Sequence, residues 1–306
     1  NKFLETFRND VPRIDIQRAV FFTESMKETE GKPNALRRSQ AFYDVLSRMT
    51  VYVNADELIV GNQAQWPKAS PIYPEYSTDW LEAELNGSPF FPDKRPGDKF
   101  YYTQEDKDKI LECVDYWKGK SLYENLRKTL PEKINQAWDA NVIDDTWVSA
   151  AGLGNVIVDY KGVVDKGLSD VMRRIENKLK RLDPREPGNT RKRWFLEAAL
   201  QGNQAVVMFS GRIADCCKEQ AEQEKDETRR RELLKLEDIC RNVPLNPART
   251  FHEAVQSIYM ILLAVHLESN GHAISLGRFD QYVYPYYKRD LEEGRITREE
   301  ALEIVE

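Results

Sequence analysis

The stretch Glu268-Ser269-Asn270-Gly271-His272-Ala273-Ile274-Ser275-Leu276-Gly277-Arg278-Phe279-Asp280-Gln281-Tyr282-Val283-Tyr284-Pro285-Tyr286-Tyr287 follows a strongly apolar run over residues 258–265. Carboxylate, amide, imidazole, hydroxyl and guanidinium groups all arrive within its first half. A buried polar group without a partner costs about 1–3 kcal/mol, so an ordinary core segment does not end in this way. We interpret the junction as an apolar helix that leads into residues lining a polar cavity.

Residues 272–279 alternate in character, which predicts a strand with two different faces. Gly271 and Gly277 allow a close backbone approach or a positive φ. A purely structural interpretation stands beside this one. Arg278 and Asp280 can form an ion pair that closes a loop, and His272 can be a core histidine with satisfied hydrogen bonds. The residues of this stretch alone do not separate the two interpretations.

The composition indicates a globular protein. The chain has 306 residues, of which 41% are hydrophobic and 31% charged, and the net charge is −6 with both signs well mixed. This balance argues against a nucleic-acid partner, which would require a concentrated basic patch. No apolar run reaches 18 residues, so we expect no membrane span. The sequence opens without a basic region and apolar block, so we expect no signal peptide and a cytoplasmic location.

The cysteines and histidines do not form a metal-binding pattern. The four cysteines lack CxxC spacing, which argues against a zinc or iron–sulfur site. Cys216 and Cys217 are adjacent in a helical pattern and are interpreted as buried small residues. The chain has three histidines, which leave little for a histidine-rich metal site. We therefore predict no metal and a reducing compartment.

Hydrophobic periodicity predicts a mainly helical chain. Thr103 with Asp106 and Thr297 with Glu300 are typical of helix N-terminal capping, and Asn34 and Thr250 are further candidate caps. The final helix lacks a C-terminal cap, so we expect the chain to continue. The aromatic region 64–102 is predicted to be irregular and packed. Helices are predicted at about 13–29, 34–49, 77–85, 103–118, 121–128, 160–182, 191–223, 226–240 and 297–306, with a short strand-like piece at 51–53.

A loop of small residues precedes the predicted helix at 160–182. The sequence over 147–160, WVSAAGLGNVIVDY, contains two glycines and can approach a ligand closely. It lacks the third glycine and the preceding strand of a dinucleotide-binding fingerprint, so we reject that assignment.

Several segments, in order, resemble one family. They are ESNGHAISLGRFDQYVYPYY (268–287), ELIVGNQAQWPKASPIYPEYSTDW (57–80), RPGDKFYYTQEDKDKILECVDYWKGKS (95–121), GLGNVIVDYKGVVDKGL (152–168), NPARTFHEAVQSIY (246–259) and GRITREEALEIVE (294–306). Together they resemble the glycyl radical enzymes, the pyruvate formate-lyase-like family, and especially its dehydratase and eliminase branch. The matches extend over nearly the whole chain.

The resemblance implies a ten-stranded α/β barrel wrapped by helices. That barrel is formed by a chain more than twice as long as this one. We therefore expect a mainly α fold with part of an α/β barrel, that is, one N-terminal domain over residues 1–306. The helical shell would occupy about 1–250, and the first barrel elements about 250–290.

The resemblance also implies radical chemistry. In this family a backbone glycyl radical generates a thiyl radical on a cysteine of a Gly-Cys-x-Glu motif. Neither that motif nor an Arg-Val-x-Gly-Tyr radical loop occurs in this chain, so we predict that the catalytic cysteine, the glutamate and the radical glycine lie outside it. No cofactor is expected to bind directly. The implied partners are a small-molecule substrate and a radical S-adenosylmethionine activating enzyme, and a homodimer stays open.

The predicted function is the N-terminal part of a glycyl radical lyase, a dehydratase that eliminates water from a small hydroxylated substrate. One alternative is a carbon–carbon lyase or arylacetate decarboxylase. Another is a non-catalytic helical scaffold or binding module. The family's polar substrate position falls on Asn155, whose amide donates and accepts hydrogen bonds without titrating. Trp147 would form a pocket wall. Ala151 stands where sulfonate-cleaving members carry an arginine, which argues against a sulfonate substrate.

The quoted stretch contributes further predicted substrate-binding residues. His272 matches a histidine at the glycerol site of the diol dehydratases. Ala273 stands where those enzymes carry a serine, so the glycerol pattern is half kept. Arg278 and Asp280 belong to the shared signature and either line the pocket or brace the first barrel strand. Ser275 is similarly placed.

Overall fold

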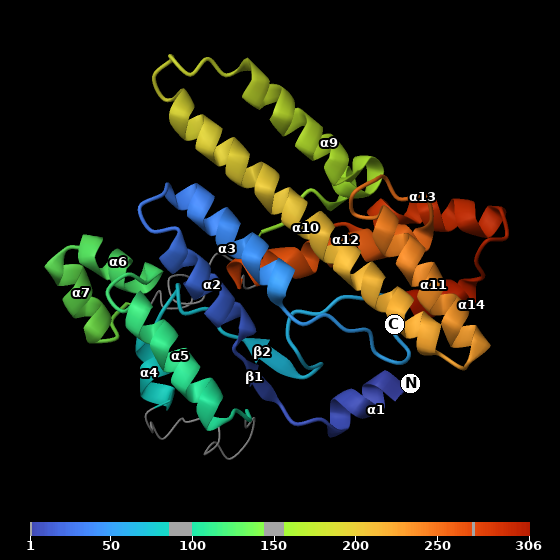
Figure 1. The fold of residues 1–306 in the computed structure, drawn as a ribbon, viewed down its shortest axis with the longest axis horizontal. Coiled ribbons are helices and arrows are strands. Elements are labelled where there is room, and N and C mark those ends of the chain that lie inside the picture. Colours follow the sequence, from blue (N-terminus) through green and yellow to red (C-terminus); the bar gives the residue numbers. More distant parts are fainter. Residues whose placement is uncertain (1, 86–99, 144–155, 271–272) are drawn as a thin grey trace.

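The computed structural model describes residues 2–85, 100–143, 156–270 and 273–306. They are mostly helical, which confirms the predicted class, and the extent of a barrel stays a prediction (Figure 1). The helices are α1 (Lys2–Asn9), α2 (Gln17–Glu28), α3 (Asn34–Arg48), α4 (Asp79–Leu85), α5 (Gln104–Trp117), α6 (Leu122–Thr129), α7 (Glu132–Asp139), α9 (Tyr160–Arg181), α10 (Asn189–Gln223), α11 (Glu227–Asn242), α12 (Phe251–Ser269), α13 (Phe279–Glu292) and α14 (Arg298–Val305); the strands are β1 (Arg13–Asp15) and β2 (Ala69–Pro71).

Helix α12 is the most apolar of the long helices and lies in the core. Thr250 caps it as predicted, because its hydroxyl accepts a hydrogen bond from the Glu253 backbone N–H at 3.2 Å. The polar side chains on α12 have specific partners. The Gln256 amide accepts from the Val60 N–H at 2.8 Å and donates to the Val60 carbonyl at 2.7 Å. Each hydrogen-bonded pair offsets the cost of burying its polar groups, so α12 holds the irregular segment 57–62 against its side.

Helix α10 is the longest element and packs against α3, α9 and α11 (Figure 1). Phe209 and Ile213 are fully buried at these contacts. Arg212 donates to the carbonyl oxygens of Leu46 at 2.6 Å and Met49 at 2.8 Å. These carbonyls lie at the end of α3 and lack helical partners there, so Arg212 satisfies them.

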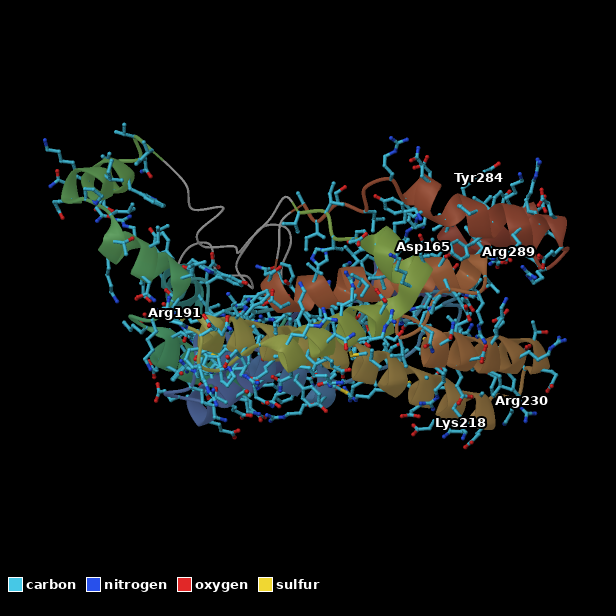
Figure 2. All side chains as sticks on the ribbon, turned by 90° about the horizontal axis from the view of Figure 1, so that it is seen from above. Asp165, Arg191, Lys218, Arg230, Tyr284 and Arg289 are labelled. Carbon is cyan, nitrogen blue, oxygen red and sulfur yellow. The ribbon has the colours of Figure 1, made fainter. Side chains whose placement is uncertain are left out.

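The tip of the α10–α11 hairpin carries side chains of both charges. Lys218 and Arg230 project outward from the two helices (Figure 2). Asp226 caps α11 by accepting from the N–H groups of Thr228 and Arg229. Charged side chains in this position remain hydrated, so the tip needs no apolar partner.

Helix α9 has a kink at Gly167. The φ of Gly167 is 73° and its ψ is 164°, a region that is essentially restricted to glycine. A Cβ there would lie 2.3 Å from the Leu245 carbonyl oxygen. The kink lets the N–H of Leu168 donate to the Pro244 carbonyl at 2.8 Å, and that of Ser169 to the Leu245 carbonyl at 2.9 Å. The loop after α11 is thereby attached to α9.

The two strands form a small parallel pair near the N-terminus. Ile14 is registered with Ser70, and a further bridge joins Arg13 to Tyr101. A second apolar cluster forms here between the strands, α2, α4 and α5, and includes Ile14, Leu81 and Ile110. Residues 13–15 were predicted to begin a helix. That prediction is wrong because their backbone groups pair with residues distant in sequence, and α2 begins only at Gln17.

Other local predictions can also be compared with the structure. The capping boxes at Thr103 and Thr297 are confirmed. Asn34 is the first helical residue of α3 and not its cap, which is Pro33. Residues 51–53 form no strand. Among the described residues, no helix combines the length and apolar character that a bilayer crossing requires.

Candidate functional site

The end of α12 leads directly into the signature stretch. Asn270 caps the helix in the left-handed conformation, with φ 45° and ψ 35°. Its N–H donates to the His266 carbonyl at 2.9 Å. Asparagine tolerates this conformation better than most residues, and it ends helices in the same way as glycine does. The sequence Ser269-Asn270 therefore turns the chain sharply out of the core.

Three elements satisfy the carbonyl groups in the last turn of α12. The Tyr73 hydroxyl donates to the His266 carbonyl at 2.8 Å. Arg18 Nε, on α2, donates to the Leu267 carbonyl at 2.6 Å. Arg38 Nη2, on α3, donates to the Glu268 carbonyl at 2.7 Å. Positive groups at a helix C-terminus interact favourably with its dipole, so the turn is held both by hydrogen bonds and by charge.

Arg18 is part of a buried ion pair. Its guanidinium forms two hydrogen bonds with the Glu75 carboxylate, at 2.6 and 3.1 Å, and lies 3.8 Å from the centre of the Tyr73 ring. The two side chains are only 2% and 5% exposed. Burial by itself lowers the pKa of Arg18, but the Glu75 carboxylate more than offsets this and leaves the pKa raised. Arg18 therefore remains charged inside the protein.

Arg38 forms the outer part of the same cluster. Its Nε pairs with the Glu268 carboxylate, and its Nη2 donates to the Tyr76 hydroxyl at 2.8 Å. The side chains of Arg38 and Glu268 are 38% and 37% exposed, so this pair lies at the surface of the described residues. Burial raises the pKa of the Tyr76 phenol to about 12, so it stays protonated as a hydrogen-bonding group.

The segment after the turn lies against the described end of the small-residue loop. The Ser275 N–H donates to the Val156 carbonyl at 3.0 Å, and the Gly277 N–H donates to Ser275 Oγ at 3.1 Å. Gly277 has φ 65°, and a Cβ there would lie 3.1 Å from Ile157 Cγ2. The two sequence segments that carry the predicted substrate-binding residues therefore meet at the backbone.

The predicted strand at 272–279 is wrong over its described part. Residues 273–278 are irregular and α13 begins at Phe279. Ala273 has φ 50°, and Asn270 and Gly277 also have positive φ, so three left-handed residues within eight positions prevent an extended strand. The alternating side chains therefore belong to an irregular loop and not to a pleated strand.

The predicted site residues divide into two groups. Asn155, His272 and Trp147 lie outside the described residues. Ala273 and Ser275 are described and exposed. Arg278 Nε lies 3.9 Å from Asp280 Oδ1, and both side chains are mostly exposed, at 67% and 77%. This pair is too long and too hydrated to hold the loop by itself.

The cysteine thiols do not offer a reactive group. Cys113, Cys217 and Cys240 are buried, and Cys216 is half-buried. Burial raises the pKa of all four thiols, to about 12 for Cys217. The thiolate is the nucleophilic form of cysteine, so these residues act as packing groups. Among the described residues, no cluster of three His, Cys, Asp or Glu side chains is arranged to hold a metal ion.

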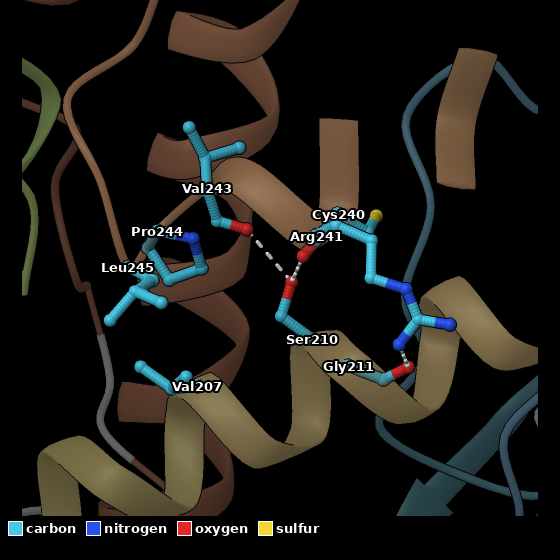
Figure 3. Close-up of a pocket in the computed structure, with 8 residues that line it drawn as sticks. All are labelled: Val207, Ser210, Gly211, Cys240, Arg241, Val243, Pro244 and Leu245. Atoms are coloured by element: carbon cyan, nitrogen blue, oxygen red, sulfur yellow. Dashed lines mark hydrogen bonds between the residues drawn. The ribbon is translucent and has the colours of Figure 1, made fainter. Parts of the chain in front are cut away.

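A small cavity lies between α10 and the end of α11 (Figure 3). Its volume is about 120 Å³, and it contains none of the predicted site residues. The Ser210 hydroxyl lies 2.9 Å from the Cys240 carbonyl oxygen and 2.8 Å from that of Val243. The serine thus satisfies carbonyl groups at the end of α11, and the cavity lies beside this contact.

Sequence reasoning missed the cluster that holds α12. Arg18, Arg38 and Glu75 are ordinary charged residues in their local sequence. One signal was available, because Arg18 lies among the apolar residues of an amphipathic helix and such an arginine requires a buried acceptor. Its partner could not be named, since Glu75 lies 57 residues away.

Comparison with known proteins identifies the family to which this chain belongs. The family model described as pyruvate formate lyase-like matches residues 1–306. The chain belongs to this family, the glycyl radical enzymes, as the resemblance predicted. Isethionate sulfite-lyase of Nitratidesulfovibrio vulgaris is 37% identical to it over 313 residues, which is 99% of this chain and 37% of that protein.

Two solved structures match closely. A structure from Roseburia inulinivorans, described for 1,2-propanediol dehydration, has a TM-score of 0.94 at 36% identity and covers 99% of this chain. The B12-independent glycerol dehydratase of Clostridium butyricum has a TM-score of 0.93 at 33% identity and covers 98%. The chain spans 36% and 37% of those chains. It therefore corresponds to little more than a third of each of these proteins.

Proposed function

We propose that this chain is the N-terminal part of a glycyl radical lyase, a dehydratase that removes water from a small hydroxylated substrate. The lyase class rests on the match over nearly the whole chain to a structure described for 1,2-propanediol dehydration and to a glycerol dehydratase, with TM-scores of 0.94 and 0.93. Within that class, Ala151 is the residue that favours dehydration over cleavage of a sulfonate. In this proposal a radical S-adenosylmethionine enzyme activates the intact protein.

The role of this chain is to hold one side of the substrate. Asn155 and His272 hydrogen-bond to hydroxyl groups, and Trp147 forms a wall of the pocket. The hydrogen bond from Ser275 to Val156 supports this arrangement, because it brings the two segments that carry these residues together. Among the described residues the side chains of Ala273 and Ser275 are exposed, and Ser275 Oγ accepts a hydrogen bond from the Gly277 N–H.

The chemistry is shared between this chain and the rest of the protein. The thiyl radical supplies hydrogen abstraction from the substrate carbon. The residues of this chain orient the substrate's hydroxyl groups and assist departure of the leaving group through hydrogen bonds. Because the neutral Asn155 amide cannot transfer a proton, proton transfer falls to His272 or to residues outside this chain. Enclosure of the site would exclude water from the radical.

Cleavage of a carbon–sulfur bond is a second candidate. The identity to isethionate sulfite-lyase, 37%, is as high as that to the propanediol-dehydration structure, 36%. Overall similarity therefore does not separate the two reactions. Ala151 favours dehydration, since it places no positive charge where a sulfonate would require one.

The test uses the intact natural protein, activated anaerobically with its activating enzyme. We expect a glycyl radical doublet in electron paramagnetic resonance, followed by turnover of 1,2-propanediol or glycerol and none of isethionate. Turnover of isethionate would replace dehydration by carbon–sulfur cleavage, and turnover of an arylacetate would indicate decarboxylation. Absence of a radical with a competent activating enzyme would favour a non-catalytic scaffold.

Site variants make the same experiment residue-specific. Asn155→Ala and His272→Ala should each lower kcat/KM at least about tenfold, because each removes a hydrogen bond to the reacting substrate. The radical yield should be unchanged. Lys218→Ala, on the exposed α10–α11 hairpin, is the matched control and should retain wild-type turnover. Equal kinetics in all three variants would remove Asn155 and His272 from the site.

A further inference from the structure

The last turn of α12 is held by Arg38 through both the side chain and the backbone of Glu268. Arg38 Nε pairs with the carboxylate, and Nη2 donates to the carbonyl oxygen at 2.7 Å. The guanidinium also lies 5.7 and 5.8 Å from the centres of the Tyr76 and Phe22 rings. The planar guanidinium of Arg38 forms hydrogen bonds in fixed directions, so it determines both the position and the rotation of Glu268.

We propose that Arg38 is a positioning residue for the substrate site, a role that rests on the proposed dehydratase function. Two residues beyond Glu268 the chain enters the left-handed turn at Asn270 and continues to the segment 273–278. If the orientation of Glu268 changes slightly, the position of the segment 273–278 relative to α12 should change with it. Arg38 acts through Glu268 and not by contact with the substrate.

Arg18 has a different role in the same cluster. Its ion pair with Glu75 is almost fully buried, so its loss would leave an unpaired charge in the core and destabilise the fold. The Arg38–Glu268 pair is more than one-third exposed. Among the described residues water can reach Glu268 when Arg38 is removed, so an Arg38 variant is expected to fold, and circular dichroism of the intact variant checks this before its kinetics are compared.

A second ion pair on α3 provides the matched control. Arg48 Nη2 lies 2.7 Å from the Glu24 carboxylate, and the two side chains are 44% and 46% exposed. Its guanidinium also lies against an aromatic ring, 4.1 Å from the centre of Phe21. This pair joins α3 to α2 and leaves the end of α12 untouched, so Arg48→Ala removes a similar interaction without the proposed consequence.

Hydrogen exchange in the unactivated intact protein tests the positioning step directly. In Arg38→Ala, amide exchange over residues 267–270 and 273–278 should be at least about tenfold faster than in wild type, because the last turn of α12 opens more often. Exchange over the same residues should be unchanged in Arg48→Ala. Identical exchange in the two variants would overturn the proposal, whatever reaction the protein catalyses.

Kinetics of the activated protein test the consequence for catalysis. In Arg38→Ala we expect kcat to fall about ten- to hundredfold, with KM within about threefold of wild type and the same radical yield. Arg38→Lys should recover part of this loss, since an ammonium keeps the charge but not the fork. Wild-type kcat in Arg38→Ala would sink the inference. A wild-type protein without radical or turnover would instead refute the proposed function and leave the exchange result to decide the role of Arg38.

Discussion

Arg18 and Glu75 form a bidentate ion pair whose side chains are only 2% and 5% exposed, and the same guanidinium donates to the Leu267 carbonyl. One buried pair thus joins α2, the loop before α4 and the end of α12. The pair lies at the point where the core helix meets the signature stretch. The pair therefore helps to fix the position of the last turn of α12, from which the signature stretch begins.

Removal of Glu75 should therefore be costly. Glu75→Ala leaves the Arg18 charge buried without its carboxylate, and we expect the free energy of unfolding to fall by about 3–5 kcal/mol. Arg48→Ala, which breaks the exposed pair with Glu24, should cost less than about 1 kcal/mol. Urea unfolding of the intact protein measures both changes. Equal losses in the two variants would show that burial does not distinguish the pairs.

Gly167 and Gly202 should respond in opposite directions to alanine. Gly167 occupies a region of φ and ψ that is essentially restricted to glycine, and an added Cβ would overlap the Leu245 carbonyl, so Gly167→Ala should destabilise by at least about 2 kcal/mol. Gly202 lies inside α10 with open space around a new Cβ, and Gly202→Ala should stabilise by about 0.5–1 kcal/mol. Thermal unfolding of the two variants checks the signs. If Gly167→Ala stabilised the protein, the kinked backbone conformation at Gly167 would be contradicted.

His252 should make stability depend on pH below neutrality. Its Nε2 donates to the Leu58 carbonyl, which leaves Nδ1 buried without a partner, and burial lowers the pKa of the ring from 6.5 to about 4. Between pH 6.5 and 4 the unfolded chain binds a proton that the folded protein does not. The free energy of unfolding therefore decreases as the pH falls through this window, by about 3 kcal/mol at most.

The His252→Gln variant isolates this contribution. Glutamine can donate to the Leu58 carbonyl but does not titrate, so its stability should decrease less steeply between pH 6.5 and 4 than that of wild type. Above pH 6.5 the two stability curves should run parallel. Lys218→Gln, an exposed change of charge, should retain the wild-type slope. An unchanged slope in His252→Gln would show that His252 is not the titrating group.

Local signals in the sequence were sufficient for most of the helices. Thr103, Thr250 and Thr297 were predicted as caps from their own neighbourhoods, and each hydroxyl accepts a hydrogen bond from the first turn of its helix. The errors arose where distant residues decide the backbone. Residues 13–15 join a strand because 69–71 lie beside them, and no periodicity within 13–29 contains that information.

The candidate site was predictable by motif and not by geometry. The signature stretch pointed to the correct family, yet its alternating side chains favoured a strand that the positive φ of Ala273 and Gly277 rules out. The supporting residues were invisible for a different reason. Gln256 and Val60 lie 196 residues apart, and a glutamine inside an apolar helix does not reveal which backbone it will bind.

The role of Arg278 can be tested directly, because the sequence predicts either that it lines the pocket or that it braces a strand. In the structure the Arg278 and Asp280 side chains lie 3.9 Å apart and are mostly exposed, and residues 273–278 form no strand that they could brace. Arg278→Ala should therefore change the free energy of unfolding by less than about 0.5 kcal/mol. If Arg278 lines the proposed pocket, the same variant should lower kcat/KM at least about tenfold, with the radical yield unchanged. Thermal unfolding and steady-state kinetics on one preparation measure both quantities. A destabilised variant with normal kinetics would return Arg278 to a structural role, since loss of packing alone would then explain the effect.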